Sequence, residues 1–173
     1  PNTLPGQVII KNNSVVEFAI KGVAGYNNAV VKITDSQFRN CKISVNLEHY
    51  NSSFIPLSMC GRAYILRTKF ITNDKFKDVP QNHVFLYNVD KISLKGNSFI
   101  NSVAIDVLNA SQRGNGIFAY NSGFNCIENR HAFGNPNIVY SEEDKSVFTG
   151  LTYGIRAEGS SAKTVRVRNC KFN

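Results

Sequence analysis

The chain has 173 residues, 42% of them apolar, and a formal net charge of +8. This length is enough for one domain with a substantial buried core, and the positive charge favours polyanionic partners such as nucleic acid, anionic polysaccharide or an acidic surface. Because no run of about eighteen apolar residues occurs, no membrane-spanning helix is expected.

A short pattern recurs along the chain: two apolar residues at alternate positions, a polar bend, and then an aromatic residue. Phe99, for example, follows Ile92 by seven positions and Leu94 by five. The residues in the aromatic position are, in chain order, Val15, Phe38, Phe70, Phe99, Phe124, Phe148 and Phe172. Only Phe148 lacks the two preceding apolar residues. Alternation of this kind predicts short β-strands, and the Asn, Asp, Ser and Gly of the bends turn the chain.

The repeat measures between 23 residues (from 15 to 38) and 32 residues (from 38 to 70). A second strand is expected after each aromatic, for example at Ile43/Val45/Leu47, Ile105/Val107 and Ile155/Ala157. No helical stretch is long enough for a crossover between strands. The pattern therefore predicts an all-β solenoid of about seven coils, in which residues 1–173 form a single β-helix domain or a segment of a longer solenoid. Since neither end has an amphipathic capping helix, we expect flanking domains in a longer chain.

Three irregular segments interrupt the repeat, around Tyr50 to Arg62, Asn73 to Gln81 and Asn129 to Asp144. Such excursions project from one edge of a solenoid, as functional loops or as plain solvated ones.

The cysteines and histidines show no recognisable metal or nucleophile motif. We expect no metal site, and we expect small apolar core residues at Cys41, Cys60, Cys126 and Cys170. Ordinary loop or surface residues are expected at His49, His83 and His131.

Runs such as Asn97-Ser98-Phe99-Ile100-Asn101 and Thr152-Tyr153-Gly154-Ile155 resemble coils of right-handed parallel β-helix repeat proteins of the pectate-lyase-like superfamily. In style they look most like secreted or cell-surface proteins of Bacteroidetes-type bacteria. The resemblance extends from Val8 to Phe172. It implies a right-handed parallel β-helix and a secreted or cell-surface location, whereas the shared coil is weak evidence for activity.

Enzymes of this superfamily act on polysaccharides in a groove along one sheet, with acidic residues on successive coils as calcium ligands or as an acid/base pair. The candidate catalytic residues are Glu48, Asp106 and Arg156, on the predicted second strands. They lie on coils that are not adjacent, so scattered surface charge is the favoured interpretation. A calcium ion is expected only if the chain is a lyase; otherwise no cofactor is expected.

The outward positions of the predicted first strands form a basic and aromatic stripe along the axis. From it we take six candidate ligand-binding residues: Lys32, Tyr64, Lys95, Tyr120, Arg166 and Arg168. Cations pair with carboxylate or sulfate, and aromatic rings stack on sugars, so the stripe suits an extended anionic glycan. An ordinary solvated sheet surface is the alternative. The sequence has no pattern typical of a nucleic-acid-binding fold, so nucleic acid is not favoured as the ligand of the stripe.

The function favoured by these observations is a non-catalytic structural or adhesive β-helix segment that contacts polysaccharide or cell-surface glycan. The alternatives are a polysaccharide lyase or glycoside hydrolase of the pectate-lyase-like type and a phage tailspike-like glycan-binding β-helix.

Overall fold

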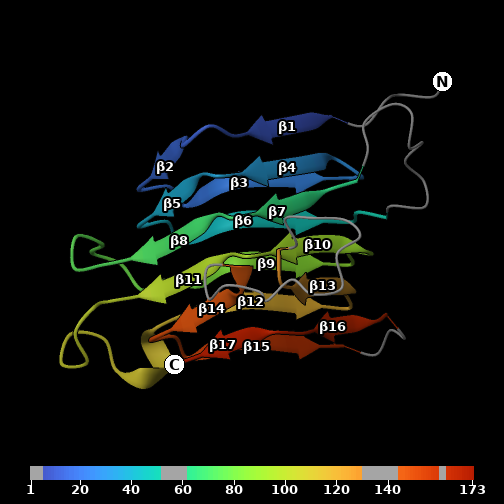
Figure 1. Cartoon of the computed structure of the whole chain (residues 1–173). Helices are drawn as coiled ribbons and strands as arrows, with labels where there is room; N and C mark the ends of the chain where they lie inside the picture. The colour runs from blue at the N-terminus through green and yellow to red at the C-terminus, as the bar shows by residue number, and fades with distance from the viewer. Residues whose placement is uncertain (1–5, 52–61, 130–143, 160–162) are drawn as a thin grey trace.

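The computed structural model describes residues 6–51, 62–129, 144–159 and 163–173. It is a right-handed parallel β-helix, as the sequence predicts, with the coils stacked from the N-terminus to the C-terminus (Figure 1). Among the described residues, no helix has the length and apolar character needed to cross a bilayer.

The strands form three parallel sheets. Sheet A contains β1 (Gln7–Ile10), β4 (Val30–Thr34), β7 (Tyr64–Leu66), β10 (Ile92–Lys95), β13 (Phe124–Ile127) and β16 (Val165–Val167). Sheet B contains β2 (Val15–Glu17), β5 (Gln37–Arg39), β8 (Lys69–Thr72), β11 (Ser98–Asn101), β14 (Ser146–Thr149) and β17 (Cys170–Phe172). Sheet C contains β3 (Lys21–Tyr26), β6 (Ile43–Glu48), β9 (Asn82–Tyr87), β12 (Asn115–Tyr120) and β15 (Tyr153–Glu158). A short 3-10 helix, η2 (Ala110–Gln112), precedes β12.

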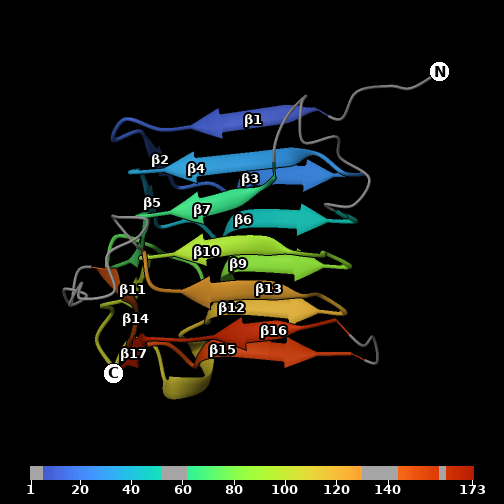
Figure 2. The ribbon, with the colours of Figure 1, turned by 45° about the vertical axis from the view of Figure 1, so that its right-hand side comes forward.

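Each coil gives one strand to each sheet in the order A, B, C, and Figure 2 shows the strands of sheets A and C stacked in this way. The described residues form five complete coils and the first two strands of a sixth, whereas the sequence predicts about seven coils. The difference arises at Phe124. It begins β13 in sheet A, where it pairs with Ile92 and Val165, so Phe124 and Phe148 belong to one coil instead of two.

Aromatic residues of the repeat stack as a ladder in sheet B. Its members are Phe38, Phe70, Phe99, Phe148 and Phe172, and successive ring centroids lie 5.3, 4.9, 4.7 and 4.8 Å apart. In-register parallel pairing places each ring directly over the next. The distance between successive rings is therefore close to the usual spacing of about 4.8 Å between neighbouring strands. Phe148, which lacks the preceding apolar pair in the sequence, is a full member.

Aliphatic columns from the other two sheets complete the core. Sheet A contributes Ile10, Ile33, Ile65, Leu94, Cys126 and Val167, and sheet C contributes Val23, Val45, Val84, Ile117 and Ile155. The predicted strands at Ile43 and Ile155 are confirmed as β6 and β15. The prediction of a strand at Ile105 and Val107 is wrong, because both side chains are 67% exposed and lie in the loop that leads to β12.

A column of small residues in sheet C faces the phenylalanine ladder. In three coils the residue is glycine, at Gly22, Gly116 and Gly154, and a Cβ added to Gly116 would lie 2.7 Å from a ring carbon of Phe148. The other two coils have Ser44 and His83 at this position. The ladder therefore leaves little room at the three glycines, whereas the His83 ring packs beside Phe70 and Phe99.

His83 is buried beside two rings of the ladder, so the expectation that it lies in a loop or on the surface is wrong. Its ring centroid is 5.8 Å from that of Phe70 and 6.2 Å from that of Phe99. Its Nδ1 is 3.5 Å from the Ser44 hydroxyl. Burial disfavours the imidazolium ion and lowers the pKa of His83 to about 4.

Left-handed residues and buried polar side chains turn the chain between sheets A and B. Asp35, Arg67 and Gly96 have φ angles of 47°, 45° and 59° at this turn. One residue later, Asn97 accepts a hydrogen bond from the Thr68 amide at 2.9 Å and donates one to the Ile65 carbonyl at 3.0 Å. Buried amides thus join neighbouring coils at the bends, as the Asn and Ser in the sequence lead one to expect.

Replacing a central ring of the ladder tests how much the stacking stabilises the fold. Phe99→Ala is expected to lower the free energy of unfolding by about 3–5 kcal/mol, because it removes two stacking contacts and leaves a cavity. Ile100→Ala, on the outward side of the same strand, is the control, with an expected loss of about 1 kcal/mol or less. Denaturant titration measures both, and equal losses would contradict a ladder-dominated core.

The neutral, buried His83 predicts a pH dependence of stability. Unfolded histidine binds a proton near pH 6.5, whereas His83 in the folded chain stays neutral until about pH 4. Between these values only the unfolded state gains the proton, so the free energy of unfolding falls as the pH falls, by up to about 1.4 kcal/mol per pH unit. In His83→Ser, which copies Ser44, the unfolding free energy measured from pH 7 to pH 4 should fall less steeply. An unchanged slope would assign the effect to other groups.

Candidate functional site

The outward side chains of sheet A form a basic face. Strand pairing places the outward residues in one column in the order Ile9, Lys32, Tyr64, Ser93, Asn125 and Arg166. Lys95 lies in the adjacent column, beside Leu66 and Ile127. Four of the six predicted ligand-binding residues, Lys32, Tyr64, Lys95 and Arg166, are thus brought to one surface. We call these four residues the basic face.

Tyr120, the fifth predicted residue, lies on β12 in sheet C and is not part of the basic face. The sequence placed it in the stripe because Phe124 was taken as a member of the ladder, which shifts the assignment of this coil by one strand. In the structure, Tyr120 stacks on Tyr87 with ring centroids 5.6 Å apart.

Arg168, the sixth predicted ligand-binding residue, lies just beyond β16, but its guanidinium group forms an ion pair with another residue of the protein. Its Nη2 and Nε donate hydrogen bonds of 2.6 and 3.1 Å to the two carboxylate oxygens of Glu128, whose side chain is fully buried. A buried carboxylate requires such a partner. Arg168 therefore has a structural role.

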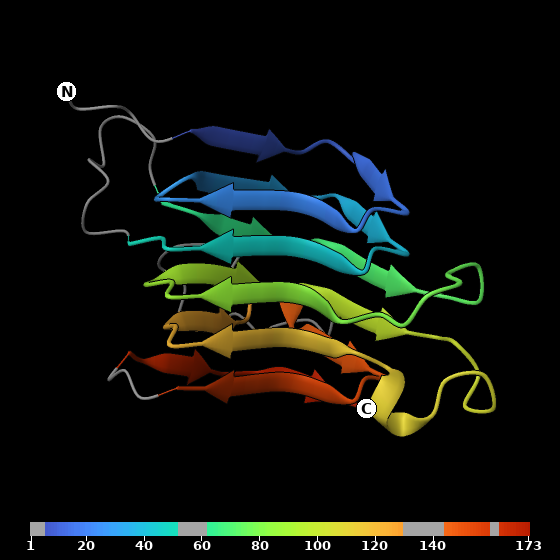
Figure 3. The same ribbon diagram turned by 180° about the vertical axis from the view of Figure 1, so that it is seen from behind.

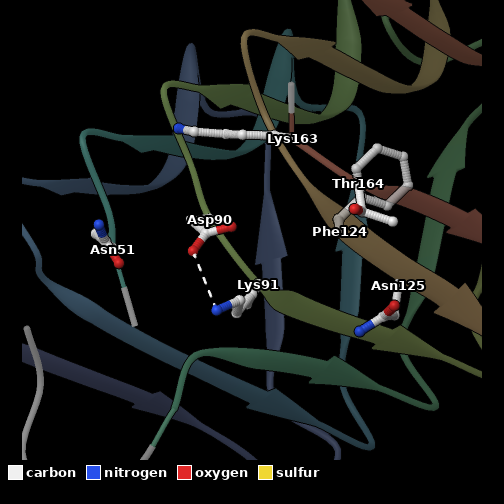
Figure 4. A pocket seen from close by; sticks show the side chains of 7 residues that line it. All are labelled: Asn51, Asp90, Lys91, Phe124, Asn125, Lys163 and Thr164. Atoms are coloured by element: carbon white, nitrogen blue, oxygen red, sulfur yellow. Dashed lines mark ion pairs between the residues drawn. The ribbon is translucent and has the colours of Figure 1, made fainter. Parts of the chain in front are cut away.

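A pocket of about 530 Å³ lies next to the basic face, where the chain turns from sheet C into sheet A. It is lined by Asn51, Asp90, Lys91, Phe124, Asn125, Lys163 and Thr164. In the view of Figure 4 the Asp90 carboxylate lies between the amines of Lys91 and Lys163, and Lys91 Nζ is 3.8 Å from Asp90 Oδ2. Two amines against one carboxylate leave an excess of positive charge. Because Asn125 belongs both to this pocket and to the outward column of sheet A, the two surfaces are continuous.

Lys91 is paired with Asp90, but four other cations of this surface make no ion pair with a described residue. Within the described part of the chain, no ion pair is made by Lys32, Lys95, Lys163 or Arg166. The charges of these four residues are therefore unpaired within the described part of the chain. Carboxylate, sulfate and phosphate groups are the chemical groups that such a surface attracts.

The outward side of sheet C, seen from behind in Figure 3, has a different character. One column runs Tyr26, Glu48, Tyr87, Tyr120 and Glu158, and the next runs Ala24, Asn46, Phe85, Phe118 and Arg156. We call this surface the aromatic face. Its charged groups have partners on the same face: Arg156 Nε donates to Glu158 at 2.6 Å, and the Asn46 amide donates to Glu48 at 2.7 Å.

A depression of about 470 Å³ lies at one edge of the aromatic face. The Arg156 guanidinium is 5.3 Å from the ring centroid of Phe118 and 5.5 Å from that of Tyr153. Two amides line the same depression, and Asn115 donates to Asn82 at 2.8 Å. Aromatic rings with paired amides and a neutralised arginine suit an uncharged, hydroxyl-rich ligand.

The three candidate catalytic residues do not come together. Glu48 and Arg156 are both on sheet C but three coils apart, which is about 14 Å at the usual strand spacing. Glu48 and Glu158 share a column, with Tyr87 and Tyr120 between them. Asp106 was predicted on a strand but is exposed in the loop between β11 and β12. In the described ranges, no three His, Cys, Asp or Glu side chains are grouped so that they could hold a metal ion.

Most of the aromatic face was missed from the sequence, because β9 was not predicted as a strand and β12 was assigned to the first strand of a coil. The available signal is the similarity of Val84-Phe85-Leu86-Tyr87 and Ile117-Phe118-Ala119-Tyr120, which pair in register. Lys91 and Lys163 lie in turns, where no periodicity marks a side chain's direction.

Comparison with protein-family models, with curated proteins and with solved structures found no match to this chain.

The different roles of two neighbouring arginines can be tested. Arg168→Gln removes an ion-pair partner of the buried Glu128 carboxylate, and because the Arg168 side chain is itself 44% exposed, the free energy of unfolding is expected to fall by about 2 kcal/mol. Arg166→Gln, an exposed residue on the same sheet, should change it by about 0.5 kcal/mol or less. Chemical denaturation of both variants measures the difference. A change in the unfolding free energy as small as that of Arg166→Gln would contradict the structural role of Arg168 and would leave its charge as a candidate for ligand binding.

Proposed function

We propose that the chain is a glycan-binding β-helix, a stiff and non-catalytic scaffold that holds an extended anionic polysaccharide on the basic face. The observation that carries the proposal is the set of sheet A cations that make no ion pair with a described residue, beside the pocket that Lys91 and Lys163 line. A secreted or cell-surface protein with an adhesive or structural role fits this surface, and the resemblance to pectate-lyase-like β-helices supports a polysaccharide as the ligand.

The length of the surface favours a polymer over a single sugar. Lys32 and Arg166 are four coils apart, which corresponds to about 19 Å along the axis. Between them, Tyr64, Ser93 and Asn125 offer a ring, a hydroxyl and an amide to sugar rings and hydroxyl groups. Lysine and arginine at the two ends supply charge for carboxylate or sulfate.

The positions of the acids support binding over catalysis. Hydrolysis of a glycosidic bond uses two carboxyl groups within about 10 Å of one another. On the aromatic face Glu48 and Glu158 are about 14 Å apart with two tyrosines between them. The lyase or hydrolase alternative therefore has less support than binding, and a tailspike-like protein would use the same binding chemistry in another assembly.

A second candidate function is the binding of a neutral glycan on the aromatic face. The specific observation is the depression in which Arg156 lies between Phe118 and Tyr153, with its charge neutralised by Glu158. The two candidates differ in the charge of the ligand and in the face that binds it.

The proposal predicts salt-sensitive binding of an acidic polysaccharide. By isothermal titration calorimetry, a polyuronate or sulfated oligosaccharide should bind more weakly as the salt concentration rises, and Lys32→Gln/Lys95→Gln should reduce its affinity about tenfold. The control is Lys69→Gln/Lys171→Gln, which removes the same charge from sheet B and should leave the affinity within about twofold.

Three outcomes would count against the basic face. Equal losses in the two double variants would mean that net charge alone attracts the ligand. Stronger binding of a neutral oligosaccharide, abolished by Tyr153→Ala, would favour the aromatic face. Tighter binding of single-stranded DNA than of any acidic glycan would make nucleic acid the ligand.

A further inference from the structure

Two cysteines from neighbouring coils face each other in the C-terminal part of the structure. Cys126 lies on β13 and Cys170 begins β17, and their sulfur atoms are 3.6 Å apart. The Cys170 sulfur is also 3.5 Å from the Cys126 carbonyl oxygen. A disulfide bond is about 2.05 Å long, so the two sulfur atoms would have to move closer by about 1.5 Å to form one.

Neither position requires a thiol for the fold. Cys126 continues a column in which the other coils have Ile33, Ile65, Leu94 and Val167. Cys170 donates to the carbonyl two residues earlier, Arg168 O, just as Ser36 and Thr68 do at the equivalent bends. An aliphatic residue and a serine would serve these positions equally well, so packing alone does not explain two thiols in contact.

The two thiols differ in accessibility and in protonation. Cys126 is buried, whereas Cys170 is half-buried and lines a depression of about 440 Å³ with Lys145, Asn169 and Lys171. The hydrogen bond between the two sulfurs raises the pKa of Cys126 and lowers that of Cys170, and burial adds to the rise at Cys126. Cys170 is therefore the more accessible of the two thiols and the one that loses its proton more readily.

We propose that Cys126 and Cys170 form a reversible redox pair, oxidised to a disulfide between coils by exchange with a low-molecular-weight disulfide. The Cys170 thiolate attacks one sulfur of glutathione disulfide, which forms a mixed disulfide and releases one glutathione thiolate. Cys126 then gives its proton to that thiolate and attacks the Cys170 sulfur, and the second glutathione leaves as a thiolate that takes up the proton Cys170 had lost to solvent. Two protein thiols are oxidised and one glutathione disulfide is reduced to two thiols.

The bond would add a covalent link to the last described coil. Within the described chain, β16 and β17 pair on one side only, and they lie at the lower end of Figure 1. Val165, Val167 and Phe172 are 37–55% exposed there. A disulfide from Cys126 to Cys170 would tie these two strands to the coil before them. It would also close residues 126–170 into a covalent loop. This inference is independent of the glycan-binding proposal.

The test is to treat the reduced, folded protein with glutathione disulfide, quench by alkylation and map the peptides by mass spectrometry. The expected product is a linked peptide that contains Cys126 and Cys170, with Cys41 still reduced, because Cys41 is only 2% exposed. Cys126→Ala should stop at a mixed disulfide on Cys170. Cys170→Ser, which introduces the hydroxyl that Ser36 and Thr68 supply at the equivalent bends, should leave Cys126 unmodified.

Amide hydrogen exchange supplies a readout on the fold. On oxidation, exchange in β16 and β17 should slow about tenfold in the original protein and stay unchanged in Cys170→Ser. The proposal is wrong if Cys170 in the reduced protein reacts no faster than Cys41, or if the oxidised protein links either cysteine to a different partner. The first comparison needs no variant, so a folding defect in a variant cannot obscure it.

Discussion

In-register stacking of equivalent residues is the constraint on which the rest of this structure depends. Each coil lies one strand spacing above the last, so whatever occurs at one position meets its counterpart one coil away. Inside the helix this produces the phenylalanine ladder and the aliphatic columns. Outside it produces continuous columns of surface side chains, and both candidate binding faces are such columns. A single geometric rule thus accounts for the core and for the surfaces that could hold a long ligand.

The fold could be predicted from the sequence because this rule leaves a repeating trace. Ile92, Leu94 and Phe99 have the same spacing as their counterparts in most other coils. The coil count was wrong because loops of different length interrupt the repeat: the segment after β13 separates Phe124 from Phe148 by about the length of one coil. At Ile105 and Val107, a loop happens to alternate like a strand. Periodicity identifies strands reliably only where the neighbouring coil supplies a partner.

The candidate site could be predicted in part for the same reason. Lys32, Tyr64 and Arg166 occupy one register position, so counting along the sequence was enough to align them. Counting could not show that Arg168 faces a buried Glu128, nor that Lys91 and Lys163 approach one pocket from separate turns. Those facts depend on the path of the chain between strands, which composition does not specify. Tyr120 was assigned to the wrong face because a one-strand error in its coil moves every outward residue to another sheet.

The narrow space opposite the phenylalanine ladder has a consequence for how the chain avoids misassembly. Repeats that resemble one another could pair after a slip of one whole coil, and most core columns would tolerate such a slip because their residues are similar in size. The column that contains His83 would not. A slip would bring an imidazole to the place of Gly116, where even a Cβ would lie 2.7 Å from Phe148. The size of the His83 side chain therefore disfavours this slip and favours the observed register.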